Sequence, residues 1–282
     1  MTPLHLARHT VVTCVGDGLA PLRAALRTGT GGLTPCRFDG VALDTWIGEV
    51  ADLDSTALPA ALADYDCRNN RLARRGLTSD GFDATVRAAI ARHGVRRVGV
   101  ILGTSTSGIL ATETAYRQRD PLSGALPASF IYRGTHNTYS LAAFVRDWFG
   151  LEGPAGVVST ACSSSAKVHA AAARMIHAGL IDAAIVGGVD SLCLTTLHGF
   201  ASLELTSPEP CRPYDAARKG ISIGEAAAFA LLERPPASLD ADAVLLLGCG
   251  ESSDAYHMSS PHPEGLGARL AMEGALARAG LR

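Results

Sequence analysis

Apolar runs of strand length recur along the chain, with longer segments of helical periodicity between them. Residues 11–15, 97–102 and 182–190 are almost continuously apolar, as in strands that a parallel sheet buries on both faces. Residues 226–233 form a further apolar element. Strands that alternate with helices predict an α/β fold with a mostly parallel sheet.

The predicted helices lie between these runs, and several end at a glycine or begin near one. They cover residues 19–29, 71–93 with an interruption at Gly81, 139–149, 192–200 and 268–279. Residues 30–70 show neither period and are expected to be irregular.

The stretch from Ala155 to Gly179 is the most informative part of the chain. A β-branched run at 157–160 meets a small-residue turn and then an alanine-rich helix, with Gly179 suited to its C-terminus. Small side chains let neighbouring backbones approach closely, so we expect this helix to be buried. Cys162 lies at the junction, where the unpaired N–H groups of the first helical turn favour a thiolate.

Cys162 is therefore a candidate nucleophile. Unpaired cysteines in alanine-rich segments are more often small packing residues, but packing needs no strand, serine-rich turn and buried helix around the thiol. The hydroxyls of residues 163–165 are expected to satisfy backbone donors at the helix start. His169 lies on the same helix, about 10 Å along the axis, too far to act on the thiol. Spacing does not exclude His136, His198, His257 and His262, although none lies in a recognisable site.

Other signals are weaker. Residues 103–109 (GTSTSGI) could cradle a phosphate, but they lack the lysine of a P-loop and the GxGxxG spacing. Cys193 and Cys211 have no predicted helix start ahead of them and are expected to be packing residues. Four carboxylates stand singly, so capping or ion pairing is expected of them: Asp190, Asp215, Glu225 and Glu233.

Composition narrows the class of protein. The 282 residues are 47% apolar and 18% charged, with a net charge of −2, which gives no basic surface for nucleic acid or an anionic membrane. Seven scattered cysteines without CxxC pairs predict reduced thiols rather than disulfides or a zinc site. The N-terminus does not resemble a signal peptide, and no apolar run approaches the roughly 18 residues of a spanning helix. We expect a soluble cytoplasmic protein.

Residues 234–242 (RPPASLDAD) are the one clear linker. After it, an apolar strand at 244–247, a glycine-rich turn and a helix repeat the order found at the start of the chain. This order predicts a duplicated fold. Residues 1–240 would form the first half, and residues 241–282 would supply only the first strand and helix of the second.

Five segments carry a resemblance to a known family. In chain order they are VSTACSSSA, DAAIVGGVDS, HGFASLELTS, CRPYDAARKGISIGEAAAFALLE and GCGESSDAYHMSSP. Together they resemble the β-ketoacyl-ACP synthases (ketosynthases), the condensing enzymes of fatty-acid and polyketide synthesis, from Val11 to the last residue. The resemblance implies the thiolase fold, an α-β-α-β-α sandwich of two similar halves, here with the second half truncated.

The resemblance also implies roles for particular residues. Cys162 resembles the acyl-accepting cysteine, whose backbone N–H would be one donor of the oxyanion hole. Ile109 and Phe200 fall at positions that line the family's acyl pocket, with plain core packing an equal alternative. The strand before Cys162 resembles the one that pairs across the two-fold axis of the family dimer. The implied partners are an acyl carrier protein, whose phosphopantetheine arm carries the substrates, and a second synthase chain in a homodimer or heterodimer. No metal or further cofactor is expected.

Some family motifs are not found in this sequence. They are an HGT-type turn and a KxxxGH-type loop, which carry the two catalytic histidines, and a glycine-flanked phenylalanine. We therefore expect this chain to accept an acyl group without elongating it. One alternative is a non-catalytic partner subunit that resembles a chain length factor, which the retained Cys162 argues against. Another is an inactive truncated product with exposed apolar surface. The acyl length and the pathway (fatty acid, polyketide or aryl polyene) stay open.

Overall fold

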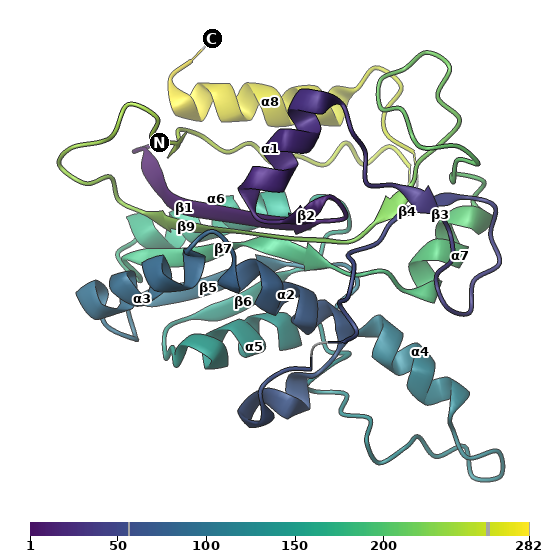
Figure 1. The fold of residues 1–282 in the computed structure, drawn as a ribbon. Helices are drawn as coiled ribbons and strands as arrows, with labels where there is room; N and C mark the ends of the chain where they lie inside the picture. Colours follow the sequence, from purple (N-terminus) through teal and green to yellow (C-terminus); the bar gives the residue numbers. More distant parts are fainter. Residues whose placement is uncertain (56, 258–259, 282) are drawn as a thin grey trace.

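A mixed sheet forms the centre of the computed structural model, which describes residues 1–55, 57–257 and 260–281 (Figure 1). Its strand order is β10-β1-β9-β7-β5-β6, with β2 paired to β1. The strands are β1 (Leu4–Thr13), β2 (Gly16–Asp17), β5 (Val98–Gly103), β6 (Ala155–Val158), β7 (Ala183–Asp190), β9 (Ala226–Glu233) and β10 (Leu245–Leu246). A smaller sheet joins β3 (Thr34–Pro35), β4 (Trp46–Gly48) and β8 (Ile223–Gly224).

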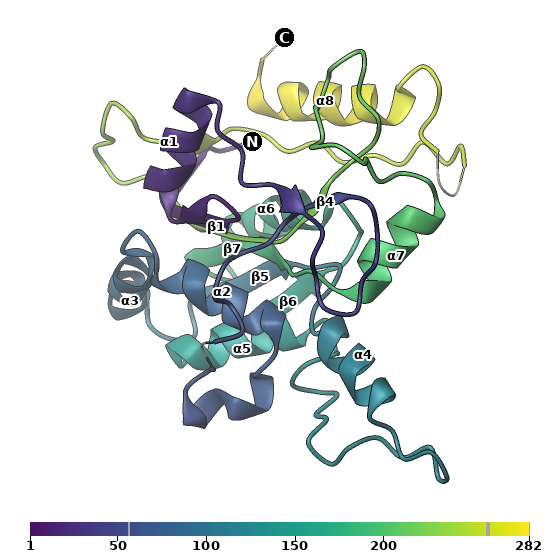
Figure 2. The same cartoon turned by 45° about the vertical axis from the view of Figure 1, so that its right-hand side comes forward.

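Helices cover both faces of the large sheet. One face carries α2 (Arg68–Thr78), α3 (Phe82–His93) and α5 (Ser140–Phe149), and the other carries α6 (Ser164–His177) (Figure 1). The remaining helices are α1 (Leu19–Thr28), the 3₁₀ helix Ala60–Tyr65, α4 (Ile109–Arg117), α7 (Leu194–Ser202) and α8 (Leu266–Ala279). Of these, α4 and α7 lie at one end of the sheet (Figure 2).

The central strands are buried on both faces because their alternate side chains enter two different apolar clusters. In β5, Val100 and Leu102 pack with the helices α2, α3 and α5, whereas Ile101 packs with α6. In β7, Ile185 and Val186 divide in the same way. This double burial explains why residues 97–102 and 182–190 have near-continuous apolar sequences, and the two predicted strands are confirmed.

The prediction of a mostly parallel sheet is wrong. Strands β5, β6 and β7 are parallel, but β9 runs antiparallel to β7, and β1 runs antiparallel to β9. The register pairs Asp190, the last residue of β7, with Ala226, the first residue of β9. Because the chain does not cross back to the other end of the sheet between these residues, β9 must return in the opposite direction.

The first strand is longer than its sequence indicates. β1 begins at Leu4, and residues 5–12 pair with β9. Within residues 4–10, His5 and His9 are half-buried and Arg8 is exposed, so this part of the strand lacks an apolar run. The predicted helices are confirmed, although α2 begins at Arg68 and α8 at Leu266, earlier than expected.

The alanine-rich helix α6 is buried on one face only. Val168, Ala172 and Ile176 pack on the sheet, but Ala166 and Arg174 are exposed, so the expectation of a fully buried helix is corrected. Among the described residues, one sheet packs against this helix. After the linker, β10 adds to the edge of that sheet beside β1, and α8 has no buried residue. The division at residue 240 stays a prediction.

Candidate active site around Cys162

Three connections from a strand to a helix meet at one edge of the sheet. They follow β5 (residues 104–108), β6 (residues 159–163) and β7 (residues 191–193). Because these three strands are parallel and adjacent, their carboxyl ends lie side by side, which is where open α/β sheets bind their ligands. Cys162 lies in the middle one of the three connections in chain order.

The connection before α6 is a tight elbow. Ala161 has φ +53°, a left-handed conformation that costs a non-glycine residue about 1 kcal/mol or more. Its carbonyl oxygen accepts hydrogen bonds from the backbone N–H and the hydroxyl of Ser164 and from the Ser105 hydroxyl, at 3.0, 2.6 and 3.1 Å. The elbow leaves Cys162 exposed, with a free thiol.

Two glycines let the first turn of α6 rest directly on the sheet. A Cβ atom at Gly103, the last residue of β5, would lie 2.6 Å from the backbone of Ser164 and Ser165. A Cβ atom at Gly188 in β7 would lie 2.6 Å from the Cβ of Ser165. No larger residue fits at either position without displacing the helix, so both strands fix the height at which Cys162 stands above the sheet.

The serines after Cys162 do not cap α6 as expected. The Ser164 hydroxyl accepts the Thr160 N–H at 2.9 Å, and the Ser163 hydroxyl donates to the Thr160 carbonyl oxygen at 2.9 Å. No side chain caps the helix at its N-cap residue. Because the chain folds back so tightly at Ala161, these hydroxyls reach the elbow rather than the N–H groups ahead of them.

The loop GTSTSGI does not offer its amides to a phosphate. The N–H groups of Ser105 and Thr106 donate to the Asp190 carboxylate at 2.7 and 2.8 Å. The Ser107 N–H donates to the Thr104 hydroxyl, and the Gly108 N–H to the Thr135 carbonyl oxygen. The hypothesis that this loop binds a phosphate is therefore wrong, because the Asp190 side chain already accepts the hydrogen bonds of its N–H groups.

Ile109 and Phe200 lie on neighbouring helices. Ile109 is the first residue of α4, and Phe200 is on the last turn of α7. The Glu113 carboxylate of α4 joins the two helices by accepting the N–H groups of Leu194 and Thr195 at 2.9 and 2.6 Å. Both apolar side chains are half-buried, and neither belongs to the three apolar clusters of the described residues. Their role in an acyl pocket stays a prediction.

Three of the histidines have structural partners away from the thiol. His136 Nδ1 lies 2.6 Å from the Thr112 hydroxyl, and its ring stacks on Tyr132. His169 Nδ1 lies 3.1 Å from the Ser165 carbonyl oxygen, and burial lowers the pKa of this histidine. His262 packs its ring edge-on against a tyrosine. None of these interactions reaches Cys162.

The sequence predicts a helix over residues 192–200 but not that Cys193 stands at its start. It is the N-cap residue of α7, with 1% of its surface exposed, and its sulfur lies 3.0 Å from the Thr196 hydroxyl. Burial raises the pKa of the Cys193 thiol. Cys67 is the N-cap residue of α2, and burial raises its pKa to about 11. The predicted packing role of Cys193 agrees with its burial, but the statement that no helix begins there is wrong.

The single carboxylates serve in capping and ion pairing, as predicted. Glu225 has a side chain with 0% exposure, lies 2.6 Å from Arg68 and accepts the Leu192 N–H at 2.9 Å. It thereby fixes the connection after β7. Glu233 pairs with Arg92 at 2.6 Å.

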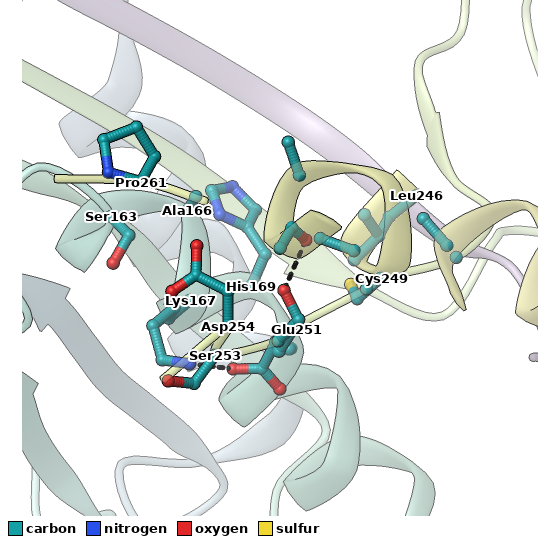
Figure 3. A pocket seen from close by; sticks show the side chains of 18 residues that line it. Ser163, Ala166, Lys167, His169, Leu246, Cys249, Glu251, Ser253, Asp254 and Pro261 are labelled. Atoms are coloured by element: carbon teal, nitrogen blue, oxygen red, sulfur yellow. Dashed lines mark hydrogen bonds and ion pairs between the residues drawn. The ribbon is translucent and has the colours of Figure 1, made fainter. Parts of the chain in front are cut away.

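A groove of about 960 Å³ lies beside the elbow (Figure 3). Its lining begins at Ser163, one residue beyond the thiol, and comes from α6, residues 246–254 and α8. Lys167 Nζ lies 2.7 Å from Glu251 across the groove, and this bond lowers the pKa of the Glu251 carboxyl. The alanines of α6 and α8 make the rest of the lining largely apolar.

Two further properties concern the described part of the chain. No three His, Cys, Asp or Glu side chains within it come together as metal ligands. None of its helices has the length and apolar character needed to cross a bilayer. The site is thus that of an α/β protein with an exposed cysteine at the carboxyl edge of its sheet.

Comparisons with known proteins identify the family. The sequence model of "Beta-ketoacyl synthase, N-terminal domain" matches residues 72–237, more than half of the chain. Nodulation protein E of Rhizobium meliloti is 35% identical over 190 residues, which are 66% of this chain and 46% of the relative. The 3-oxoacyl-(acyl-carrier-protein) synthase 2 of Coxiella burnetii is 30% identical over 96% of this chain and 68% of the relative. The chain belongs to the β-ketoacyl synthase family.

Solved structures agree with this assignment. A ketosynthase in complex with its chain length factor from Xenorhabdus doucetiae matches with a TM-score of 0.85 and 37% identity, over 99% of this chain and 69% of that chain. The ishigamide ketosynthase/chain length factor matches with a TM-score of 0.84 at 24% identity, over 100% of this chain and 70% of that chain. The predicted thiolase-like fold is confirmed. The chain spans about half the length of several curated relatives, 46% for the Rhizobium meliloti protein.

Proposed function

We propose that Cys162 accepts an acyl group from an acyl carrier protein and holds it as a thioester. The observation that carries this proposal is the exposed thiol on the Ala161 elbow, at the carboxyl edge of a ketosynthase sheet. A thiol that served only for packing would be buried, as Cys67 and Cys193 are.

The proposed reaction is a thioester exchange. The Cys162 thiolate attacks the carbonyl carbon of the acyl group on the phosphopantetheine arm, and a tetrahedral oxyanion forms. The backbone N–H of Cys162 donates a hydrogen bond to this oxyanion. The new sulfur–carbon bond is retained, and the phosphopantetheine thiolate leaves and takes up a proton. Ile109 and Phe200 would contact the acyl chain.

Condensation would require a second step. Malonyl-ACP would lose CO₂, its carbanion would attack the Cys162 thioester, and the cysteine thiolate would leave. The family resemblance assigns stabilisation of the malonyl enolate to two histidines in motifs that these 282 residues do not include. We therefore propose acyl transfer, without elongation, for the 282-residue chain by itself.

The proposed partners are an acyl carrier protein and a second synthase chain. Matching structures include a ketosynthase with its chain length factor and a ketosynthase with its acyl carrier protein. Strand β6 supports pairing with a second chain, because it is an edge strand that pairs only with β5 among the described residues. We propose that β6 pairs across a two-fold axis in a homodimer or a synthase heterodimer.

A second candidate function is that of a non-catalytic partner subunit, as in the complexes of a ketosynthase with its chain length factor. Such a subunit would shape the acyl pocket and form no thioester. The accessible thiol of Cys162 favours the first candidate.

Mass spectrometry of the intact chain after mixing with acyl-ACP tests the proposal. A set of acyl-ACPs of increasing chain length is used, and peptide mapping locates any adduct. We expect one acyl group on Cys162. The variant C162A should carry none, a loss of acylation of at least about 1000-fold. The buried control C193A should form the normal adduct. Malonyl-ACP added afterwards should give no β-ketoacyl product. A folded sample that stays unmodified with every acyl-ACP would contradict the nucleophile assignment and favour the partner subunit.

A further inference from the structure

One carboxylate oxygen organises the loop between β5 and α4. Asp190 Oδ1 accepts the Ser105 and Thr106 N–H groups at 2.7 and 2.8 Å, and the Thr104 and Thr106 hydroxyls at 3.0 and 2.9 Å. Asp190 thereby ties the end of β7 to the loop that follows its neighbour β5.

The same loop touches the nucleophile elbow through one side chain. The Ser105 hydroxyl donates to the Ala161 carbonyl oxygen at 3.1 Å. Ala161 directly precedes Cys162 and holds the left-handed conformation at φ +53°. Its carbonyl is therefore held from outside the elbow by Ser105, and Ser105 is itself held through its N–H by Asp190.

We propose that Asp190 is a positioning residue for Cys162. Its carboxylate fixes Ser105, and the Ser105 hydroxyl fixes the carbonyl of Ala161. The elbow then keeps the Cys162 sulfur and backbone N–H aimed outward at the incoming thioester. This inference rests on the proposed acyl transfer at Cys162, and it assigns to Asp190 no contact with the substrate.

The bonding pattern predicts which substitutions keep the role. All four hydrogen bonds end on a single oxygen, and an asparagine carbonyl oxygen can accept them in the same place. Asp190→Asn should therefore retain the positioning, whereas Asp190→Ala should lose it. Asp182 offers a matched control: it directly precedes the opposite end of β7 and bonds Arg97 at 2.8 and 2.9 Å, far from the elbow.

The experiment measures two rate constants on folded protein, checked by circular dichroism, for the wild type, D190A, D190N, S105A and D182A. The first is the single-turnover acylation of Cys162 by saturating acyl-ACP. The second is the alkylation of Cys162 by iodoacetamide, which needs no carrier protein. A displacement of about 1 Å costs about 100-fold in a reaction that depends on orientation.

We expect D190A to slow acylation about 100-fold and alkylation several-fold, with D190N close to the wild type and D182A unchanged in both. S105A removes only the final hydroxyl, so it should slow acylation even if D190A does not fold. The proposal is overturned if S105A and D190A behave as D182A does, or if D190N is as slow as D190A. Should the wild type alkylate but not acylate, the proposed function fails, and the alkylation series still decides the role of Asp190.

Discussion

The elbow at Cys162 and the start of α7 at Cys193 are two versions of one local structure. In both, a cysteine lies in the short connection between a strand and a helix, at the same edge of the sheet: Cys193 is the N-cap residue of α7, and Cys162 directly precedes the N-cap residue of α6. Cys162 follows the left-handed Ala161 and is exposed, whereas Cys193 has an extended backbone, φ −151°, and is buried. The polar support differs too, since serines hold the first connection and the carboxylates of Glu113 and Glu225 hold the second.

This difference shows that a cysteine near a helix start is not always accessible to solvent. Cys67, which begins α2, is a second buried example. The exposed thiol of the three is the one that follows a residue in the left-handed conformation. Cys67 follows a 3₁₀ helix rather than a strand, so the three positions share only a nearby helix start. Exposure separates Cys162 from the other two cysteines.

The strongest test of this contrast is chemical labelling of the native protein. Iodoacetamide should modify Cys162 at least about 100-fold faster than Cys193 and Cys67, because a buried thiol reacts only after local opening. Peptide mass spectrometry over a time course measures each site. Equal rates at the three cysteines would show that exposure does not distinguish them in solution.

A second test removes the close approach under the elbow. Gly103→Ala should reduce the free energy of unfolding by about 1–3 kcal/mol, because the added Cβ would meet the backbone of Ser164 and displace α6. Urea unfolding measures the change. Gly156→Ala in β6 is the matched control, since the nearest atom to its added Cβ lies 3.9 Å away. If both variants lose the same stability, contact with α6 is not the cause.

A third test concerns the ionisation of a buried helix-start thiol, whose effect is negligible at neutral pH. The folded pKa of Cys67 is raised by burial to about 11, whereas a thiol in the unfolded chain ionises near pH 8.5. The unfolded state therefore releases its proton first, and the stability that Cys67 contributes is full below about pH 8.5 and is lost as pH rises toward 11. The limiting slope is about 1.4 kcal/mol per pH unit.

Urea unfolding of the wild type and C67A between pH 7 and 10.5 measures this slope. The wild type should lose stability more steeply than C67A above about pH 8.5. The difference in the free energy of unfolding between the two proteins at pH 7 gives the cost of truncating the side chain, and it is subtracted from the differences at higher pH. Parallel curves at alkaline pH would mean that Cys67 does not titrate as its burial requires.

The sequence by itself predicted most of the local elements and the junction at which Cys162, the proposed nucleophile, lies. Because β5 and β7 are buried on both faces, their sequences are apolar runs that predict strands. The change from β-branched residues to alanines marks the junction at Cys162. These features depend on neighbours within a few residues, so periodicity and residue type suffice to find them.

Only the tertiary structure decided the direction of β9, the extent of β1, the N-cap position of Cys193 and the hydrogen bonds of Asp190. Asp190 bonds a loop some 85 residues away in sequence, and β1 pairs with β9 across most of the chain. Such contacts are set by which surfaces meet once the chain is folded, and no local pattern records them. A thiol becomes accessible or buried by the same long-range packing, which is why identical residues at similar helix starts have different environments.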